Sequence, residues 1–141
     1  MKIIHARPPN FDAIAAALPM AAKPSVIFTY GDSIFCPGGG PISPWIMAHE
    51  RVHSVQQGAD PIAWWDRYLA DVEFRFAQEL EAHRAEWRAW LSLRNRNRAE
   101  RRGYMVVVGM RLAGPLYGRM VRFAKARELI LEEKTPEEAD G

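Results

Sequence analysis

Residues 49–53 read HERVH, and they lie in a stretch, residues 44–57, whose pattern predicts a helix. Residues four apart share one face of a helix, so the imidazoles of His49 and His53 point the same way and can bind one metal ion. Zinc accepts imidazole nitrogens, and water bound to zinc becomes reactive near neutral pH. Glu50 is placed to take a proton from such a water. The pattern therefore predicts a zinc site with Glu50 as general base.

The residues that flank this stretch are typical of helix ends. Ser43 suits the N-cap and Pro44 the first helical position, and Gly58 can close the C-terminus in a left-handed conformation. The alternative is that the two histidines form an ordinary polar pair and that the motif arises by chance. The bounded helix and the glutamate at the second position favour the metal site.

The composition is typical of one globular domain. The chain has 141 residues, of which 48% are hydrophobic and 26% charged. We expect residues 1–131 to form a single domain and residues 132–141 to be a disordered acidic tail, because the last ten residues contain five acids and one base. The net charge of +2 therefore combines a basic body with an acidic end, which slightly favours an anionic partner.

The sequence also bears on localisation. The first eleven residues, MKIIHARPPNF, contain no long apolar run, so we expect no signal peptide. The stretch that comes closest to a membrane span, Met105–Met110, is far too short to cross a bilayer, so we expect no membrane partner. The single cysteine excludes an internal disulfide bond and is consistent with a reducing compartment. We expect a cytoplasmic protein, or one associated with a larger particle.

Periodicity along the chain predicts an α+β fold, mostly helical, with a short β-hairpin or small sheet. The predicted strands are Lys2–Ala6, Ser25–Tyr30 and Ser33–Cys36, and the last two form the hairpin. The other predicted helices are Phe11–Met20, one that begins at Asp60-Pro61, one from Asp71 to about Leu93, Tyr104–Ala113 and Ala124–Leu131.

A catalytic zinc needs a third protein ligand, and the chain offers Glu79, Glu81 and His83. Glu79 and Glu81 are two residues apart and cannot share a helix face. Glu79 shares its face with charged and polar residues, which predicts a solvated position. Glu81 shares its face with alanines that would allow close helix packing, so we predict Glu81 as the third ligand. The alternative is that Glu81 pairs with a nearby arginine.

These features resemble the gluzincins, the thermolysin-like branch of zinc metallopeptidases, and the minimal zincin domains of bacterial and phage genomes. The motif at residues 49–53 is followed by a glutamate on a later helix, and Glu81-Ala82 matches the small residue that commonly follows the third ligand. The resemblance covers about residues 25–90. It implies a zincin-like fold and a peptidase in which His49, His53 and Glu81 bind Zn²⁺ and Glu50 activates water.

The resemblance stops short of a complete enzyme. There is no clear counterpart of the histidine or tyrosine that thermolysin-like enzymes use against the oxyanion, and Tyr68, His83 and Tyr117 are the candidates. Each of the three also suits an ordinary structural role, and His83 could instead orient a ligand. The backbone edge of the strand at residues 33–36 could pair with an extended peptide substrate, or it could simply be covered.

The predicted function is hydrolysis of peptide bonds in a peptide or protein substrate. One alternative is a zincin-like protein that binds zinc but serves as a structural or assembly component, for example in a phage particle. A second alternative is a basic adaptor that binds nucleic acid, in which the motif is accidental. The arginine-rich residues 94–102 lack interleaved aromatic residues, so nucleic acid is the less favoured partner.

Overall fold

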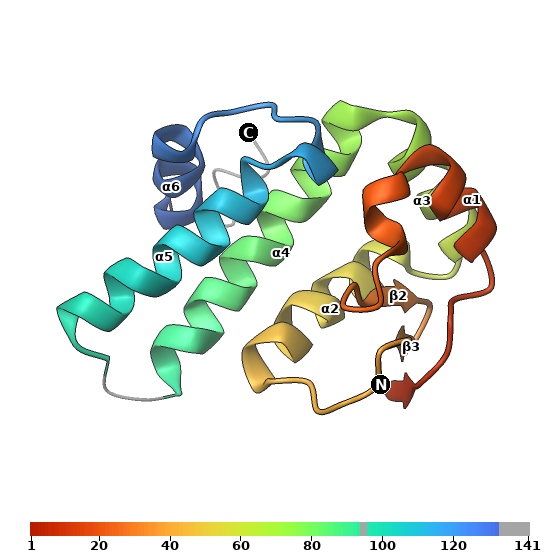
Figure 1. The fold of residues 1–141 in the computed structure, drawn as a ribbon, viewed down its shortest axis with the longest axis horizontal. Coiled ribbons are helices and arrows are strands. Elements are labelled where there is room, and N and C mark those ends of the chain that lie inside the picture. Colours follow the sequence, from red (N-terminus) through yellow and green to blue (C-terminus); the bar gives the residue numbers. More distant parts are fainter. Residues whose placement is uncertain (94–95, 133–141) are drawn as a thin grey trace.

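The computed structural model describes residues 1–93 and 96–132. Three strands, six α-helices and two short 3₁₀ helices succeed one another in these residues (Figure 1). In chain order they are β1 (Lys2–Ile4), α1 (Phe11–Ala17), η1 (Pro19–Ala22), β2 (Phe28–Tyr30), β3 (Ser33–Phe35), α2 (Pro44–Gln57), α3 (Pro61–Ala70), α4 (Val72–Ser92), α5 (Arg98–Leu112), η2 (Pro115–Tyr117) and α6 (Phe123–Leu131). The predicted α+β class, mostly helical with a small sheet, is confirmed.

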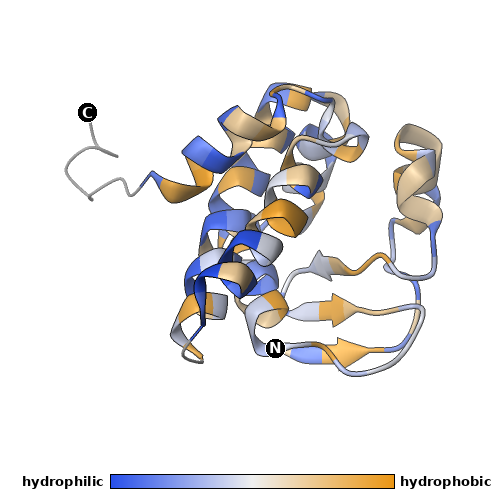
Figure 2. Ribbon diagram, turned by 60° about the vertical axis from the view of Figure 1, so that its left-hand side comes forward, coloured by the Kyte–Doolittle hydropathy of each residue, from blue (hydrophilic) through white to orange (hydrophobic). Residues whose placement is uncertain are grey.

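The sheet has the strand order β1-β3-β2, and its strands lie to one side of the helices (Figure 2). β2 and β3 form the predicted antiparallel hairpin, with Thr29 opposite Ile34. Gly31 takes a φ of +63° in the turn, a conformation that favours glycine. β1 joins the other edge of β3 in parallel, with Ile3 opposite Ile34. The sequence did not predict this second pairing, because it joins residues far apart in the chain.

Helix α2 begins at Pro44 and ends at Gln57, as predicted. Ser43 is the N-cap residue, as predicted, but its side chain makes no capping hydrogen bond. Gly58 follows the helix with a φ of +56° and a ψ of −130°, so its φ is positive but its conformation is not left-handed helical. The helix boundaries therefore depend on backbone geometry rather than on a side-chain cap.

Polar side chains cap the N-termini of the next three helices and so fix where each helix begins. The Asp60 carboxylate accepts a hydrogen bond from Ala63 N at the start of α3, and the Asp71 carboxylate does the same at the start of α4. At the start of α5, Asn97 and Glu100 form a capping box. Because this box lies within the arginine-rich segment, α5 begins six residues before the helix that the sequence predicted.

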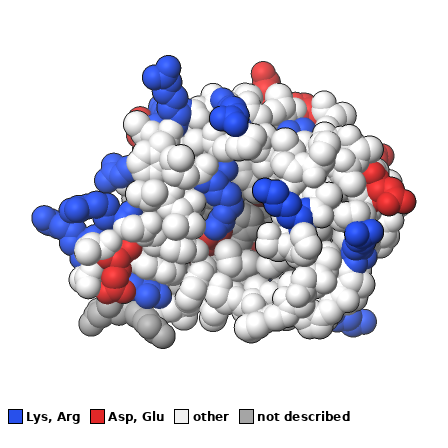
Figure 3. Space-filling view, viewed as in Figure 1, with Lys and Arg blue, Asp and Glu red and all other residues white. Residues whose placement is uncertain are grey.

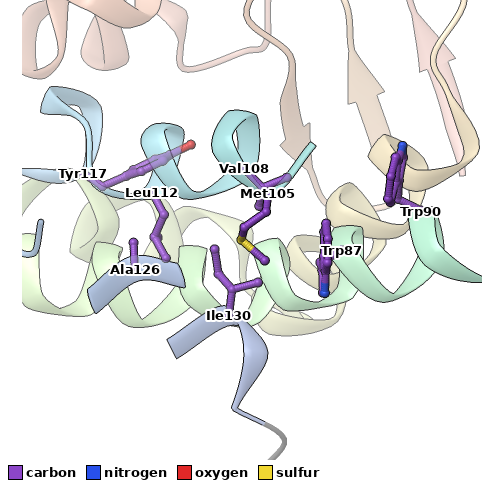
Figure 4. Close-up of a cluster of buried hydrophobic side chains, with 8 residues drawn as sticks. All are labelled: Trp87, Trp90, Met105, Val108, Leu112, Tyr117, Ala126 and Ile130. Carbon is purple, nitrogen blue, oxygen red and sulfur yellow. The ribbon is translucent and has the colours of Figure 1, made fainter. Parts of the chain in front are cut away.

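Helix α4 lies between α2 on one side and α5 and α6 on the other (Figure 1). Its most extensive contact is with α2, and it also packs against α5 and α6. One buried apolar cluster joins α4 to α5, η2 and α6 (Figure 4) and consists of Trp87, Trp90, Met105, Val108, Leu112, Tyr117, Ala126 and Ile130. A second cluster lies beneath the sheet and α1 and consists of Ile14, Leu18, Ala21, Phe28, Trp64, Trp65 and Tyr68.

No helix among the described residues is long and apolar enough to cross a membrane. The predicted acidic tail, residues 132–141, lies outside the described residues except for Glu132.

Candidate metal centre

The two histidines of α2 face α4, where one carboxylate meets both rings. The Nε2 atom of His53 lies 3.0 Å from Oε1 of Glu79, and the Nε2 atom of His49 lies 3.4 Å from the same oxygen. All three side chains are buried. The one-turn spacing in α2 therefore has the predicted effect, and α4 supplies a carboxylate where a third ligand would lie.

The third residue is Glu79 and not Glu81, so that prediction is corrected. Glu81 is exposed, and its Oε2 accepts a hydrogen bond from Nε2 of Gln56 at 3.0 Å. The face of α4 that the sequence suggested was solvated is the buried one, because Arg75, His83 and Glu86 are buried on it together with Glu79. The face that carries Glu81 turns toward solvent.

A second carboxylate fixes the orientation of His49. Oε1 of Glu86 lies 2.9 Å from Nδ1 of His49 and accepts a hydrogen bond from Arg111 at 2.7 Å. The Tyr104 hydroxyl donates to Oε2 of Glu86 at 2.6 Å. Both carboxylate oxygens therefore accept hydrogen bonds, and Nδ1 of His49 is the donor on its side of the ring. A carboxylate behind a metal-binding histidine has this role in many metal sites.

Gln56 fixes the orientation of His53 in a similar way. Its amide nitrogen donates to the backbone oxygen of Gln78 and to Glu81, so its Oε1 faces Nδ1 of His53 at 2.8 Å. An amide oxygen only accepts, which makes Nδ1 of His53 the donor. Glu81 therefore contacts the site only indirectly, through its hydrogen bond with Gln56.

These contacts create an unfavourable interaction between the Nε2 atoms of both rings and the Glu79 carboxylate. A neutral ring whose Nδ1 carries the hydrogen presents a lone pair at Nε2, and an ionised carboxylate presents only lone pairs. Such an arrangement is repulsive unless a cation lies between the ring and Glu79. The cation can be a proton on each ring or a metal ion.

In the absence of metal, protons supply that charge. Burial disfavours the cationic form of His49, but hydrogen bonds to Glu79 and Glu86 outweigh burial and raise the pKa of the ring to about 10. Burial likewise opposes charge on His53, and the Glu79 carboxylate raises the pKa of this ring above its ordinary value. Burial disfavours the anion of Glu79, yet the two rings hold the pKa of this carboxyl well below its usual range. The site thus keeps a buried anion that needs positive charge.

His83 adds a third imidazole to the site. Its Nδ1 donates to the backbone oxygen of Glu79 at 2.6 Å, and its Nε2 is buried without a hydrogen-bond partner. Burial and the charge of His49 lower the pKa of His83 to about 3, so the ring is neutral and Nε2 carries a lone pair. His49, Glu79 and His83 each offer a ligand atom within 4.8 Å of the others, and this buried group could hold a metal ion.

Two sets of ligands therefore overlap. His49 and Glu79 belong to both, and the third member is either His53 or His83. Ligands about 2.0–2.1 Å from a tetrahedral zinc lie roughly 3.3 Å from one another. The distances of 3.0 Å and 3.4 Å from Glu79 to the two rings of α2 agree with that spacing. The imidazole and carboxylate donors also fit zinc chemically.

Glu50 lies beside these ligands in a small cavity. Its Oε2 accepts a hydrogen bond from the Thr29 hydroxyl at 2.6 Å, and the side chain is buried. The cavity has a volume of about 70 Å³. Its polar wall includes His49, Glu50, His53 and Glu79. Thr29, which was not predicted, therefore orients the candidate general base.

Apolar residues from the N-terminal segment line the other side of the cavity. Ile14 and Leu18 from α1 and its C-cap, and Ala21 from η1, line this wall and are buried. The space is large enough for a few water molecules but not for a peptide.

The three predicted oxyanion or orienting residues also gather at the site. The Tyr68 hydroxyl lies 3.5 Å from Oε2 of Glu79, and both Tyr68 and Tyr117 line the cavity. Burial, and then the negative charge of Glu79, raise the pKa of both phenols well above the ordinary value, so both keep their hydrogen. His83 lies behind His49, with the two ring centres 4.8 Å apart.

The expected substrate strand does not have a free edge. Ser33–Phe35 is the central strand and pairs on both sides, so of the two alternatives for residues 33–36 the covered edge is the correct one. The neighbouring edge strand, β2, lines the cavity, but its Thr29 carbonyl already accepts hydrogen bonds from Gln57 and Trp65. An extended peptide could not pair there without displacing these side chains.

Sequence reasoning missed Glu86, Tyr104 and Arg111. One signal was available, because Glu79, His83 and Glu86 recur at spacings of four and three and so share one face of a helix. The role of that face was misassigned, since the helix carries charged residues on several sides. No signal identified Tyr104 and Arg111, because they approach Glu86 from a different helix.

Comparison of the chain with protein-family models, with curated proteins and with solved structures gave no match in any of the three.

Proposed function

We propose that the chain is a zinc-dependent peptidase, related in mechanism to the zincins. The observation that supports this most is the approach of the His49 and His53 Nε2 atoms to one oxygen of Glu79, with Glu50 in the same cavity. An accidental motif on a surface helix would not be expected to bury four such side chains together, since burial of charge is costly without a partner. In this proposal His49, His53 and Glu79 hold zinc.

When bound, zinc would supply a Lewis acid and make a water reactive near neutral pH. Glu50 accepts the proton of the attacking water and returns it to the leaving amine. Thr29 binds one oxygen of Glu50 and so fixes the direction of the carboxylate. Tyr68 and Tyr117 keep their phenolic hydrogens and are the candidate donors to the carbonyl oxygen of the substrate.

The test combines metal content with proteolysis. Purified protein should contain about one zinc per chain, as one site requires. It should cleave a protein substrate such as casein, with new N-termini identified by mass spectrometry. Glu50→Gln should keep the zinc and lower the cleavage rate by about 10²–10⁴-fold, the usual contribution of general acid–base catalysis.

A matched control is Glu73→Gln, which changes an exposed glutamate in the first turn of α4 and should leave the cleavage rate unchanged. Cleavage that persists unchanged in Glu50→Gln would contradict the proposed role of Glu50. A folded, metal-free protein that gains no zinc on addition would contradict the whole proposal.

A second candidate function is that of a zinc-binding assembly protein without efficient catalysis, such as a component of a phage particle. Two observations favour it. The unpartnered Nε2 of His83 could act as a fourth protein ligand and close the site, as in structural zinc centres. The cavity is also small, with a volume of about 70 Å³. Zinc binding with no cleavage over a broad peptide library would favour this candidate.

His83→Ala separates the two functions. A peptidase that uses three protein ligands should keep its zinc in this variant, whereas a closed four-ligand site should lose affinity sharply. We propose a cytoplasmic or particle-associated location for either function, with which the single free thiol of Cys36 is consistent.

A further inference from the structure

The positive charge of the molecule is concentrated at one end. Residues 96–131 contain nine basic and two acidic side chains, a net charge of +7, whereas residues 1–93 contain eight basic and ten acidic ones, a net charge of −2. Figure 3 shows basic side chains gathered at the end of the molecule that Figure 1 assigns to α5 and α6. This basic end lies on the side of α4 opposite to the one that packs against α2 and the candidate metal centre.

A groove with a volume of about 820 Å³ opens between the C-terminal half of α4, α5 and α6. The groove combines two kinds of side chain. Its apolar residues are Trp87, Leu91, Met105, Val106, Phe123 and Leu131, and its basic residues are Arg98, Arg101, Arg102 and Arg127. All four arginines are exposed. A ligand that fills this groove would need apolar groups and negative charge together.

The apolar surface continues from the groove across the outer face of α5. Val106, Val107 and Met110 are between 46% and 56% exposed. At spacings of one, three and four residues these side chains form one continuous patch on the helix, next to the arginines of its first turns. A helix that packs on a protein core normally turns its apolar face inward, so this outward apolar patch needs another explanation.

We infer that α5 and α6 form a peripheral binding surface for an anionic phospholipid bilayer. The arginines of the groove bind headgroup phosphates, and Val106, Val107 and Met110 enter the boundary between headgroups and acyl chains. Basic residues that flank an exposed aliphatic face are the pattern of a helix that lies in a membrane interface rather than across it.

Two other occupants fit less well. A second copy of the chain would bring two surfaces of charge +7 together, which is repulsive. Nucleic acid would satisfy the arginines, but single strands stack on aromatic rings, and the exposed apolar side chains here are aliphatic. The inference replaces the expectation of no membrane partner with contact at the membrane surface. It does not depend on the metal centre.

The test is cosedimentation of the full-length protein with vesicles. Vesicles of phosphatidylcholine with roughly one-third phosphatidylserine should bind the protein, and vesicles of phosphatidylcholine alone should bind it far less. Changing Arg98, Arg101 and Arg102 to Gln should weaken partitioning by on the order of a hundredfold, since each basic residue near an anionic bilayer contributes roughly a factor of five. The matched control changes Lys2, Lys23 and Arg67 to Gln, which removes three charges from exposed positions elsewhere.

A separate variant tests the contribution of the exposed apolar side chains of α5 to membrane binding. Val106→Gln with Met110→Gln changes two exposed side chains, and circular dichroism should show that the helices are intact. This variant should keep binding that is sensitive to salt but lose the binding that remains at high salt. Equal partitioning of wild type and the arginine variant would overturn the inference. So would absence of vesicle binding, or tight DNA binding that is lost only in the arginine variant.

Discussion

The two sides of helix α4 bury different kinds of side chain. Toward α2 the helix buries Glu79, His83 and Glu86, which are linked by hydrogen bonds to side chains or backbone. Toward α5 it buries Trp87 and Trp90, whose rings stack with centres 5.5 Å apart. All five of these side chains are buried, but only the three that face α2 are ionisable.

Because of this difference, the two sides of α4 contribute differently to the stability of the fold. An apolar cluster stabilises the fold as soon as it is removed from water. A buried cluster of carboxylates and imidazoles costs free energy unless its charges are paired, and replacing such a cluster with apolar residues is often neutral or stabilising. The apolar side of α4 therefore stabilises the fold, whereas the charged side could hold a metal ion, and we propose that this is its role.

The largest expected effect separates two glutamates on opposite faces of α4. Glu79→Gln should weaken zinc binding by more than about a hundredfold, beyond the effect of residues that only orient a ligand. Glu81→Gln should change it by only a few-fold, because Glu81 reaches the site through Gln56. Competition with a chelator measures both affinities. Similar losses in the two variants would mean that Glu79 is not a ligand.

The protonation of the charged side predicts how the metal-free protein responds to pH. The pKa of His49 is raised from 6.5 to about 10 in the folded chain, so its contribution to stability is fully present below pH 6.5 and is lost as pH rises toward 10. A shift of this size corresponds to at most about 5 kcal/mol, at about 1.4 kcal/mol per pKa unit. Glu86 acts in the acidic range instead, since its pKa is lowered from 4.5 to about 2.

Chemical denaturation at several pH values, with chelator and with zinc, measures this effect. Zinc should remove the loss of stability above pH 6.5, because it supplies the positive charge that the protons supplied. If the metal-free and zinc-loaded proteins lose stability in parallel as pH rises, then the histidines are not the groups that zinc binds.

The apolar side should respond to substitution without any change in metal content. Leu112 is fully buried in the cluster with Ile130, so Leu112→Ala should lower the free energy of unfolding by about 2–5 kcal/mol. Leu93→Ala, at an exposed position, should cost less than about 0.5 kcal/mol. Both variants should bind one zinc per chain. A loss of zinc from folded Leu112→Ala would show that the two sides are not independent.

The smallest effect concerns the contact between the two sides. Arg111 lies on α5 but donates to Glu86, which orients His49. Arg111→Met should therefore weaken zinc binding by about 10–100-fold, and Arg111→Lys should restore part of the loss. Arg102→Met changes an exposed arginine on the same helix and should have no effect on zinc. An unchanged affinity in Arg111→Met would remove Arg111 from the site.

Local signals predicted much of the fold. Pro44 and Gly58 bound α2, and Asp60 and Asp71 cap the helices that follow, so each signal lies at the helix end that it marks. The start of α5 was predicted too late, although the capping box of Asn97 and Glu100 was visible in the sequence. The parallel pairing of β1 with β3 depends on contacts between distant residues, so no local pattern could predict it.

The candidate site could be predicted only in part, for a related reason. His49, Glu50 and His53 lie within five residues, so helix geometry alone brings them together. The choice between Glu79 and Glu81 requires knowing which face of α4 meets α2, and periodicity shows only that the two faces differ. Burial of the more polar face is the opposite of what hydrophobicity predicts, which is common where the buried groups serve a function.

Anomalous diffraction at the zinc edge from crystals of the zinc-loaded protein tests the central claim most directly. A single peak should lie about 2.0–2.2 Å from Nε2 of His49, from Nε2 of His53 and from a carboxylate oxygen of Glu79. A peak elsewhere in the molecule, or a peak bound by His49 and His53 with Glu79 turned away, would contradict the account.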